Sequence, residues 1–146
     1  MTAITIVPAD VRIVLAPPGS TMSLPVSEPI TAGEYVRHDS TTGYARLGNA
    51  SSLSECRQNS YLAANVAGDG TIQAAQRGAI LELGDALDAL DIDDKVYVAD
   101  ADGGLADTPG TVEYVAGIVI PGFMAGSPHN LLRLTLGDPI IDTGVC

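Results

Sequence analysis

Aspartate is the residue type with the clearest chemical potential in this sequence, because its carboxylates gather in one stretch. Six of them surround a glycine pair between residues 91 and 107: Asp91, Asp93, Asp94, Asp100, Asp102 and Asp107. Closely spaced carboxylates are ligands that calcium prefers, but the closing glutamate of an EF-hand loop and a third oxygen-bearing position are missing. Asp100, Asp102 and Asp107 are thus weak metal candidates. The alternative is a solvated turn, and we expect no cofactor.

The histidines and cysteines lack the partners that catalysis requires. A nucleophile or base normally works with a partner and an orienting third group at recognisable positions. His38 falls in a predicted hairpin turn and His129 in a predicted loop, so both are interpreted as solvated loop residues. Cys56 has no motif around it and is interpreted as a small buried residue. The sequence therefore predicts that the protein is not an enzyme.

Charge and composition remove further classes of function. The net charge is −11, and the seven basic residues are scattered along the chain, so we expect no nucleic-acid partner. Aromatic residues make up only 4% of the chain and tryptophan is absent, which disfavours a base-stacking or sugar-binding cleft. The longest apolar stretch, residues 115–126, is broken by Pro121 and Gly122 and falls short of the ~20 residues that span a bilayer. We expect no membrane partner, and the N-terminus does not resemble a signal peptide.

Sixteen glycines and nine prolines separate short β-rich runs, which indicates a mostly β fold built from hairpins. Residues 35–48 and 97–110 each predict a β-hairpin around a polar Asp/Gly turn, either as an internal repeat or through shared turn chemistry. Further strands are predicted at 2–7, 11–16, 71–75, 79–83, 112–120 and 131–136. One short helix is predicted from Ser52 to about Ala64, because Ser52 and Glu55 form a capping-box pattern. Residues 84–94 fit either a helix or a surface loop.

The proline-rich part of the chain suggests how it is divided. Residues 1–16 form an arm or a first strand, residues 17–30 a loop, and residues 31–146 one β-barrel or β-sandwich domain. Proline cannot donate to a β-ladder, so Pro25 and Pro29 exclude a regular central strand in the loop.

Segments between residues 31 and 123 carry a resemblance to a known family. They read Ala32-Gly-Glu-Tyr-Val, Gly43-Tyr-Ala, Gly70-Thr-Ile-Gln-Ala-Ala-Gln-Arg-Gly78-Ala-Ile, Asp94-Lys-Val-Tyr-Val-Ala-Asp, Gly103-Gly-Leu-Ala-Asp-Thr-Pro-Gly110 and Val115-Ala-Gly-Ile-Val-Ile-Pro121. This order resembles the small decoration, or cement, proteins of tailed bacteriophages. The resemblance implies a β-barrel or β-sandwich protomer with one short helix. It also implies a homotrimer that binds the major capsid protein on the outer surface of the virion and stabilises the shell against packaged DNA.

The resemblance carries no catalytic residues and no defined motif for shell contact. The resemblance implies that the protein is made in the host bacterial cytoplasm. To attach to the shell it needs a capsid-binding element, and we expect one in the N-terminal stretch. Its alternating residues are able to add a strand to a capsid edge: Ile4, Ile6, Val11 and Ile13. The same periodicity equally fits an ordinary first strand of the domain. The alternatives for function are a tail-tube, head-completion or fibre-base module and, from another class, a small hydrolase or a metal-dependent carbohydrate binder.

Overall fold

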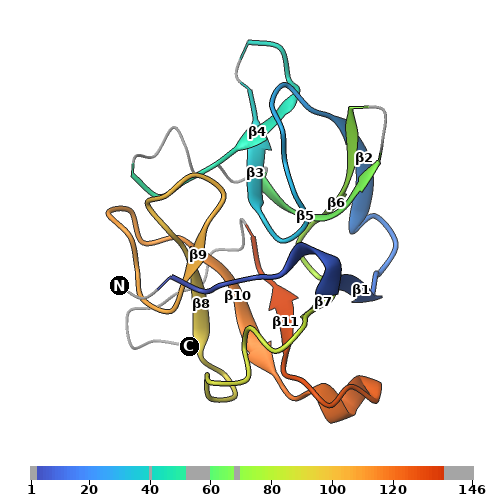
Figure 1. The fold of residues 1–146 in the computed structure, drawn as a ribbon, viewed down its shortest axis with the longest axis vertical. Coiled ribbons are helices and arrows are strands. Elements are labelled where there is room, and N and C mark those ends of the chain that lie inside the picture. Colours follow the sequence, from blue (N-terminus) through green and yellow to red (C-terminus); the bar gives the residue numbers. More distant parts are fainter. Residues whose placement is uncertain (1–2, 40, 52–59, 68–69, 137–146) are drawn as a thin grey trace.

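The computed structural model describes residues 3–39, 41–51, 60–67 and 70–136, and this part of the chain is almost entirely β-structure (Figure 1). Two 3-10 turns, η1 (Pro8–Asp10) and η2 (Gly122–Ala125), accompany the strands. The strands are β1 (Val11–Leu15), β2 (Thr21–Pro25), β3 (Tyr35–His38), β4 (Ala45–Leu47), β5 (Ser60–Ala67), β6 (Thr71–Ala75), β7 (Ile80–Leu83), β8 (Lys95–Val98), β9 (Leu105–Ala106), β10 (Val115–Ile120) and β11 (Leu131–Leu134). They form two antiparallel sheets in a sandwich-like arrangement, which confirms the predicted fold class.

A six-stranded sheet, in the order β1-β7-β11-β10-β8-β9, supplies most of the central core. Alternate residues of its strands point to the second sheet, as the pleat requires. Leu81 and Leu83 of β7 and Leu132 and Leu134 of β11 are almost completely buried in this central cluster. An aliphatic core of this kind explains how the chain folds with so few aromatic residues.

In the five-stranded sheet, in the order β2-β6-β5-β3-β4, residues 61–64 of the central strand β5 are buried on both faces. Leu62 and Ala64 of β5 face the central cluster, whereas their neighbours Tyr61 and Ala63 belong to a second, smaller cluster. The sheet curls around this second cluster until Val26, just after β2, forms a parallel bridge with Ala45 of β4. In the described residues this is a single bridge, and neither sheet closes into a barrel.

Both predicted hairpins are confirmed, as β3–β4 and β8–β9. Each turn holds a glycine with a positive φ angle, 76° at Gly43 and 72° at Gly103, a conformation that glycine adopts without steric cost. The hairpins also bond to each other, since the Gly103 N–H donates to the Gly48 carbonyl and the Tyr35 N–H to the Gly103 carbonyl.

The predicted helix is wrong where the structure describes it, because residues 60–64 belong to β5 and the described part of the chain contains only 3-10 turns as helical structure. Residues 52–59 lie outside the described residues. Residues 84–94, for which helix and loop were both considered, form turns here.

The predicted loop at residues 17–30 also needs correction, because β2 lies within it. This strand pairs with β6 alone and is therefore an edge strand, with Pro25 as its last residue. Proline is tolerated at such a position because an edge strand has one side without ladder bonds. The prolines do exclude a central strand, but they leave room for an edge strand.

Candidate functional site

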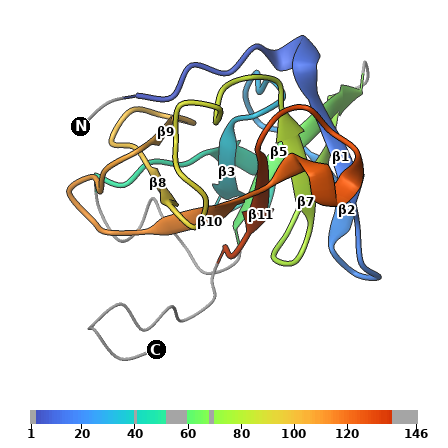
Figure 2. The same ribbon diagram turned by 90° about the horizontal axis from the view of Figure 1, so that it is seen from below.

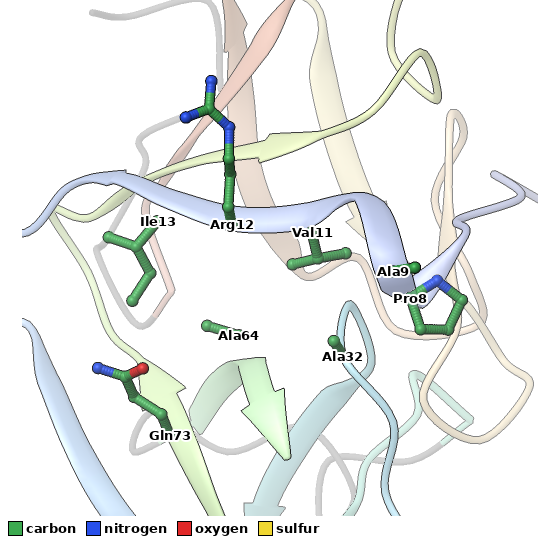
Figure 3. Close-up of a pocket in the computed structure, with 8 residues that line it drawn as sticks. All are labelled: Pro8, Ala9, Val11, Arg12, Ile13, Ala32, Ala64 and Gln73. Atoms are coloured by element: carbon green, nitrogen blue, oxygen red, sulfur yellow. The ribbon is translucent and has the colours of Figure 1, made fainter. Parts of the chain in front are cut away.

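Two hollows flank the first strand, β1. Figure 3 shows one of them with the side chains that line it. This hollow, of about 440 Å³, lies between β1 and the face of β5 and β6. Val11 and Ile13 point into it from β1, toward Ala64 of β5, whereas Arg12 points away (Figure 3). Its lining is mostly apolar, with the amide of Gln73 on one side: Pro8, Ala9, Val11, Arg12, Ile13, Ala32, Ala64 and Gln73.

The second hollow, of about 430 Å³, lies on the other side of β1 and is polar. Its lining combines acidic and basic side chains with two small residues: Ala9, Asp10, Arg12, Glu82, Gly84, Asp85 and His129. Arg12 borders both hollows. This polar hollow brings Arg12, Glu82 and His129 together with Asp10 and Asp85, so it is the candidate site.

Arg12 and Glu82 form the central ion pair of the candidate site. They are direct partners in the ladder between β1 and β7, and the Arg12 Nε lies 2.6 Å from the Glu82 Oε2. The Ser127 hydroxyl donates a hydrogen bond to the Glu82 Oε1. The hydrogen bonds from Arg12 and Ser127 favour the charged carboxylate and lower the pKa of Glu82 to about 2. The same hydrogen bond to Glu82 raises the pKa of Arg12.

A second ion pair joins His129 to Asp88. The His129 Nδ1 lies 2.7 Å from the Asp88 Oδ2, and the Asn130 N–H donates to the Asp88 Oδ1 at 2.9 Å. The hydrogen bonds from Asn130 and His129 lower the pKa of Asp88. The hydrogen bond to Asp88 raises the pKa of His129, and the charges of Asp88, Glu82 and Asp85 add to this effect.

The chemistry of the cluster does not suit Ser127 as a nucleophile. A serine nucleophile needs a base that removes its proton, and the group bonded to the Ser127 hydroxyl is Glu82. A carboxylate with a pKa of about 2 is a very weak base at neutral pH. The cluster instead connects β1, β7, the turn at residue 88 and the segment before β11 through charge-assisted hydrogen bonds.

The candidate metal ligands do not converge on one point. Both Asp100 oxygens accept from Thr111, at 2.8 Å from its N–H and 2.8 Å from its hydroxyl. Asp102 accepts from the Asn49 amide at 2.6 Å, and Asp107 also has an interaction partner. Within the described ranges, no group of three or more His, Cys, Asp or Glu side chains is placed to hold a metal ion. These aspartates act as turn and loop connectors.

The four candidate capsid-binding residues lie against the central core. Ile4, Ile6, Val11 and Ile13 are partly buried and pack on the central cluster. Packing is close at Gly33, where an added Cβ would lie 2.7 Å from the Ile6 Cγ2. Of the two alternatives for this stretch, an arm or a first strand, the packing favours a first strand for β1. Capsid binding by these side chains stays a prediction.

Sequence reasoning missed the polar cluster and the environment of both histidines. His38 lies in β3 rather than a turn, and its Nε2 is 2.8 Å from the Tyr61 hydroxyl. His129 and Asp88 are 41 residues apart, and no local pattern links them. The cross-strand pair of Arg12 and Glu82 requires knowledge of the sheet order, which a sequence pattern does not supply.

Among the described residues, no helix has the length and apolar character needed to cross a membrane. No protein-family model, curated protein or solved structure matches this chain.

Proposed function

We propose that this chain is a structural virion protein that binds the outer surface of a tailed-bacteriophage head and stabilises the capsid against the pressure of its DNA. Its partners in this role are the major capsid protein and further copies of itself in a homotrimer. The proposal begins from the resemblance of residues 31–123 to decoration proteins and gains support from where those residues lie in the fold.

The observation that carries the proposal is that three of the resembling parts, the β3–β4 hairpin, the β8–β9 hairpin and β10, are bonded to one another. β6 and the start of β7, which also belong to the resembling segments, are separated from these parts in the two sheets by β5 and β11. In the part formed by the two hairpins, residues far apart in the sequence are bonded. The Tyr35 N–H donates to the Gly103 carbonyl at 3.0 Å, and the Ala50 N–H donates to the Ala99 carbonyl at 2.8 Å. The two hairpins and β10 thus form one bonded part of the fold, which is what a resemblance to a common structural unit predicts.

The polar cluster further supports a role without catalysis. Its serine is bonded to a carboxylate of very low basicity, and its histidine is held by Asp88. The strong negative charge suits a protein present in many copies, since it favours solubility and limits nonspecific association.

Release of DNA from heated phage heads tests the stabilising role. Heads that lack the protein are expected to release their DNA at a lower temperature than heads to which the purified chain has been added. Added albumin, another acidic protein, serves as the control and is expected to have no effect. Equal release temperatures with and without the chain, despite saturating addition, would contradict the proposal. Hexameric rings of the free chain would favour a tail-tube module instead.

A further inference from the structure

Acidic residues are distributed unevenly along this chain, and two segments that form β1, β2, β6 and the start of β7 have none. Residues 11–27 and 70–81 contain no Asp or Glu, and their only charged residues are Arg12 and Arg77. These two segments contribute +2 to the net charge of −11, so the rest of the chain carries −13. We call the surface formed by β1, β2 and the turns at residues 16–20 and 76–78 the acid-free edge.

The parts of the acid-free edge adjoin each other in space. β2 pairs with β6 along its whole length, and the Gln76 N–H donates to the Ser20 carbonyl at 2.7 Å. The turn at Gly78 lies beside Pro17, with 3.9 Å between an added Cβ and the proline ring. Figures 1 and 2 both place β1 and β2 on the side of the molecule away from β8 and β9. These segments therefore form one surface region, which Asp10 and Glu82 of the candidate site border at Arg12.

Each sheet has two outer strands. Among the described residues, β1 and β2 are the outer strands that no other segment covers, and both belong to the acid-free edge. At the other end of the six-stranded sheet, Ala3 bridges to Ala106 and the Ile4 N–H donates to the Leu105 carbonyl, which covers β9. The outer strand β4 is covered by Val26 and Ser27. β1 and β2 are each last in their sheet, and no described backbone group pairs with their outer sides.

β1 carries one exposed charge, Arg12, and β2 ends in Pro25, but the other side chains of these two strands lack the charges of a protected edge. Proteins usually place charged residues on exposed edge strands, which prevents pairing with other chains. β2 has no charged residue, and its Met22 is 43% exposed. Leu15, at the end of β1, is 55% exposed. Both are large apolar side chains whose exposure to water is unfavourable, so burial in an interface would stabilise them.

We propose that the acid-free edge is the surface through which copies of this chain associate. The charges favour a second copy as the occupant. Contact through another face would bring together surfaces from the rest of the chain, which carries a net charge of −13 in each copy. The edge also presents two different strands, one from each sheet, and a closed ring such as a trimer requires two different surfaces on each copy. The inference rests on the homotrimer of the proposed function and names its surface.

Substitutions that place a negative charge on the edge test this inference. In Leu15→Glu and Met22→Glu a charged carboxylate would have to be buried between neighbouring copies, whereas both positions are exposed in the protomer. We expect sedimentation to give a trimeric mass for the wild-type chain and at least about a tenfold weaker association for each variant. Ile92→Glu is the matched control, since Ile92 is 44% exposed in the turn at residues 84–94. It should remain trimeric.

The thermal melt of each protomer is recorded alongside, which separates lost association from lost folding. If a variant fails to fold, the wild-type chain still provides a test through hydrogen exchange, because the outward-facing amides of residues 11–15 and 21–24 should become protected as its concentration rises. A wild-type chain that stays monomeric, or Leu15→Glu and Met22→Glu variants that assemble like the wild type, would overturn the inference. Neither measurement uses capsids, so head binding can succeed or fail independently. If the wild-type chain is monomeric and these variants no longer bind heads, the acid-free edge is the surface that contacts the capsid instead.

Discussion

Arg12 on β1 and Glu82 on β7 lie directly opposite each other in the six-stranded sheet, with 2.6 Å between the Arg12 Nε and the Glu82 Oε2. This pair fixes an edge strand to the body of the sandwich, and Ser127 completes the bonding of the carboxylate. Glu82→Gln is expected to lower the free energy of unfolding by about 1–3 kcal/mol, since charge-assisted hydrogen bonds are lost. Denaturant unfolding measures this, with the exposed Glu113→Gln as the control that changes little.

The effect of Glu82→Gln should also depend on pH, in a direction set by the low pKa. Because folding lowers the pKa of Glu82 from 4.5 to about 2, its ionised form stabilises the protein fully above pH 4.5. This stabilisation is lost as the pH falls toward 2. The difference in unfolding free energy between wild type and variant should shrink across that interval. A constant difference would show that the charge of Glu82 does not stabilise the fold.

The pair of His129 and Asp88 predicts a change at higher pH with the opposite sign. Folding raises the pKa of His129 above 6.5, so its protonated form stabilises the protein fully below pH 6.5. The stabilisation disappears as the pH rises through the raised pKa. His129→Asn and Asp88→Asn should both remove this decline, which denaturant midpoints measured on both sides of pH 6.5 would detect. Variants that decline as steeply as the wild type would contradict the assignment.

Calcium and its removal should have no effect on the loops around Gly103. Asp100 and Asp102 already accept hydrogen bonds from Thr111 and Asn49, and the described acidic side chains do not converge. We therefore expect the same melting temperature with chelator and with added calcium. Asp100→Ala should melt earlier, and equally so in both conditions, because its turn bonds are lost. A melting temperature that falls with chelator and recovers with calcium would revive the metal site.

Deletion of residues 2–14 should destabilise the protein severely. It removes Ile4, Ile6, Val11 and Ile13 from the central cluster and leaves β7 without one of its neighbours. Circular dichroism should show a far lower melting temperature or aggregation, whereas the control Thr5→Ala, at an exposed position, should melt normally. A truncated chain that stays folded and oligomeric but no longer attaches to heads would restore the arm interpretation.

Local patterns predicted much of this fold, because turn glycines and alternating strand residues are visible in the sequence. Both hairpins and strands β6, β7, β10 and β11 were found in this way. β5 was missed because both of its faces are buried, so Tyr61, Leu62, Ala63 and Ala64 form an unbroken apolar run that a helix equally fits. The Ser52 capping pattern strengthened that error.

The candidate site was harder to predict than the fold, because its residues meet only through long-range pairing. Arg12 and Glu82 are 70 residues apart, and His129 reaches Asp88 because β7 and β11 are neighbours in the sheet. The aspartates near Gly103 are close together in the sequence, which made them metal candidates. In the structure, Asp102 accepts a hydrogen bond from Asn49 and Asp100 accepts one from Thr111. Residue type was visible in the sequence, but orientation and partner were not.

Binding to phage heads tests the central proposal most directly. The purified chain is mixed with expanded heads that lack it, and the copies that sediment with the heads are counted as its concentration rises. We expect binding that saturates at a fixed number of copies per head, whereas unexpanded proheads take up fewer. No co-sedimentation, or uptake that rises without saturation and equally on both kinds of head, would contradict the assignment of this chain as a capsid decoration protein.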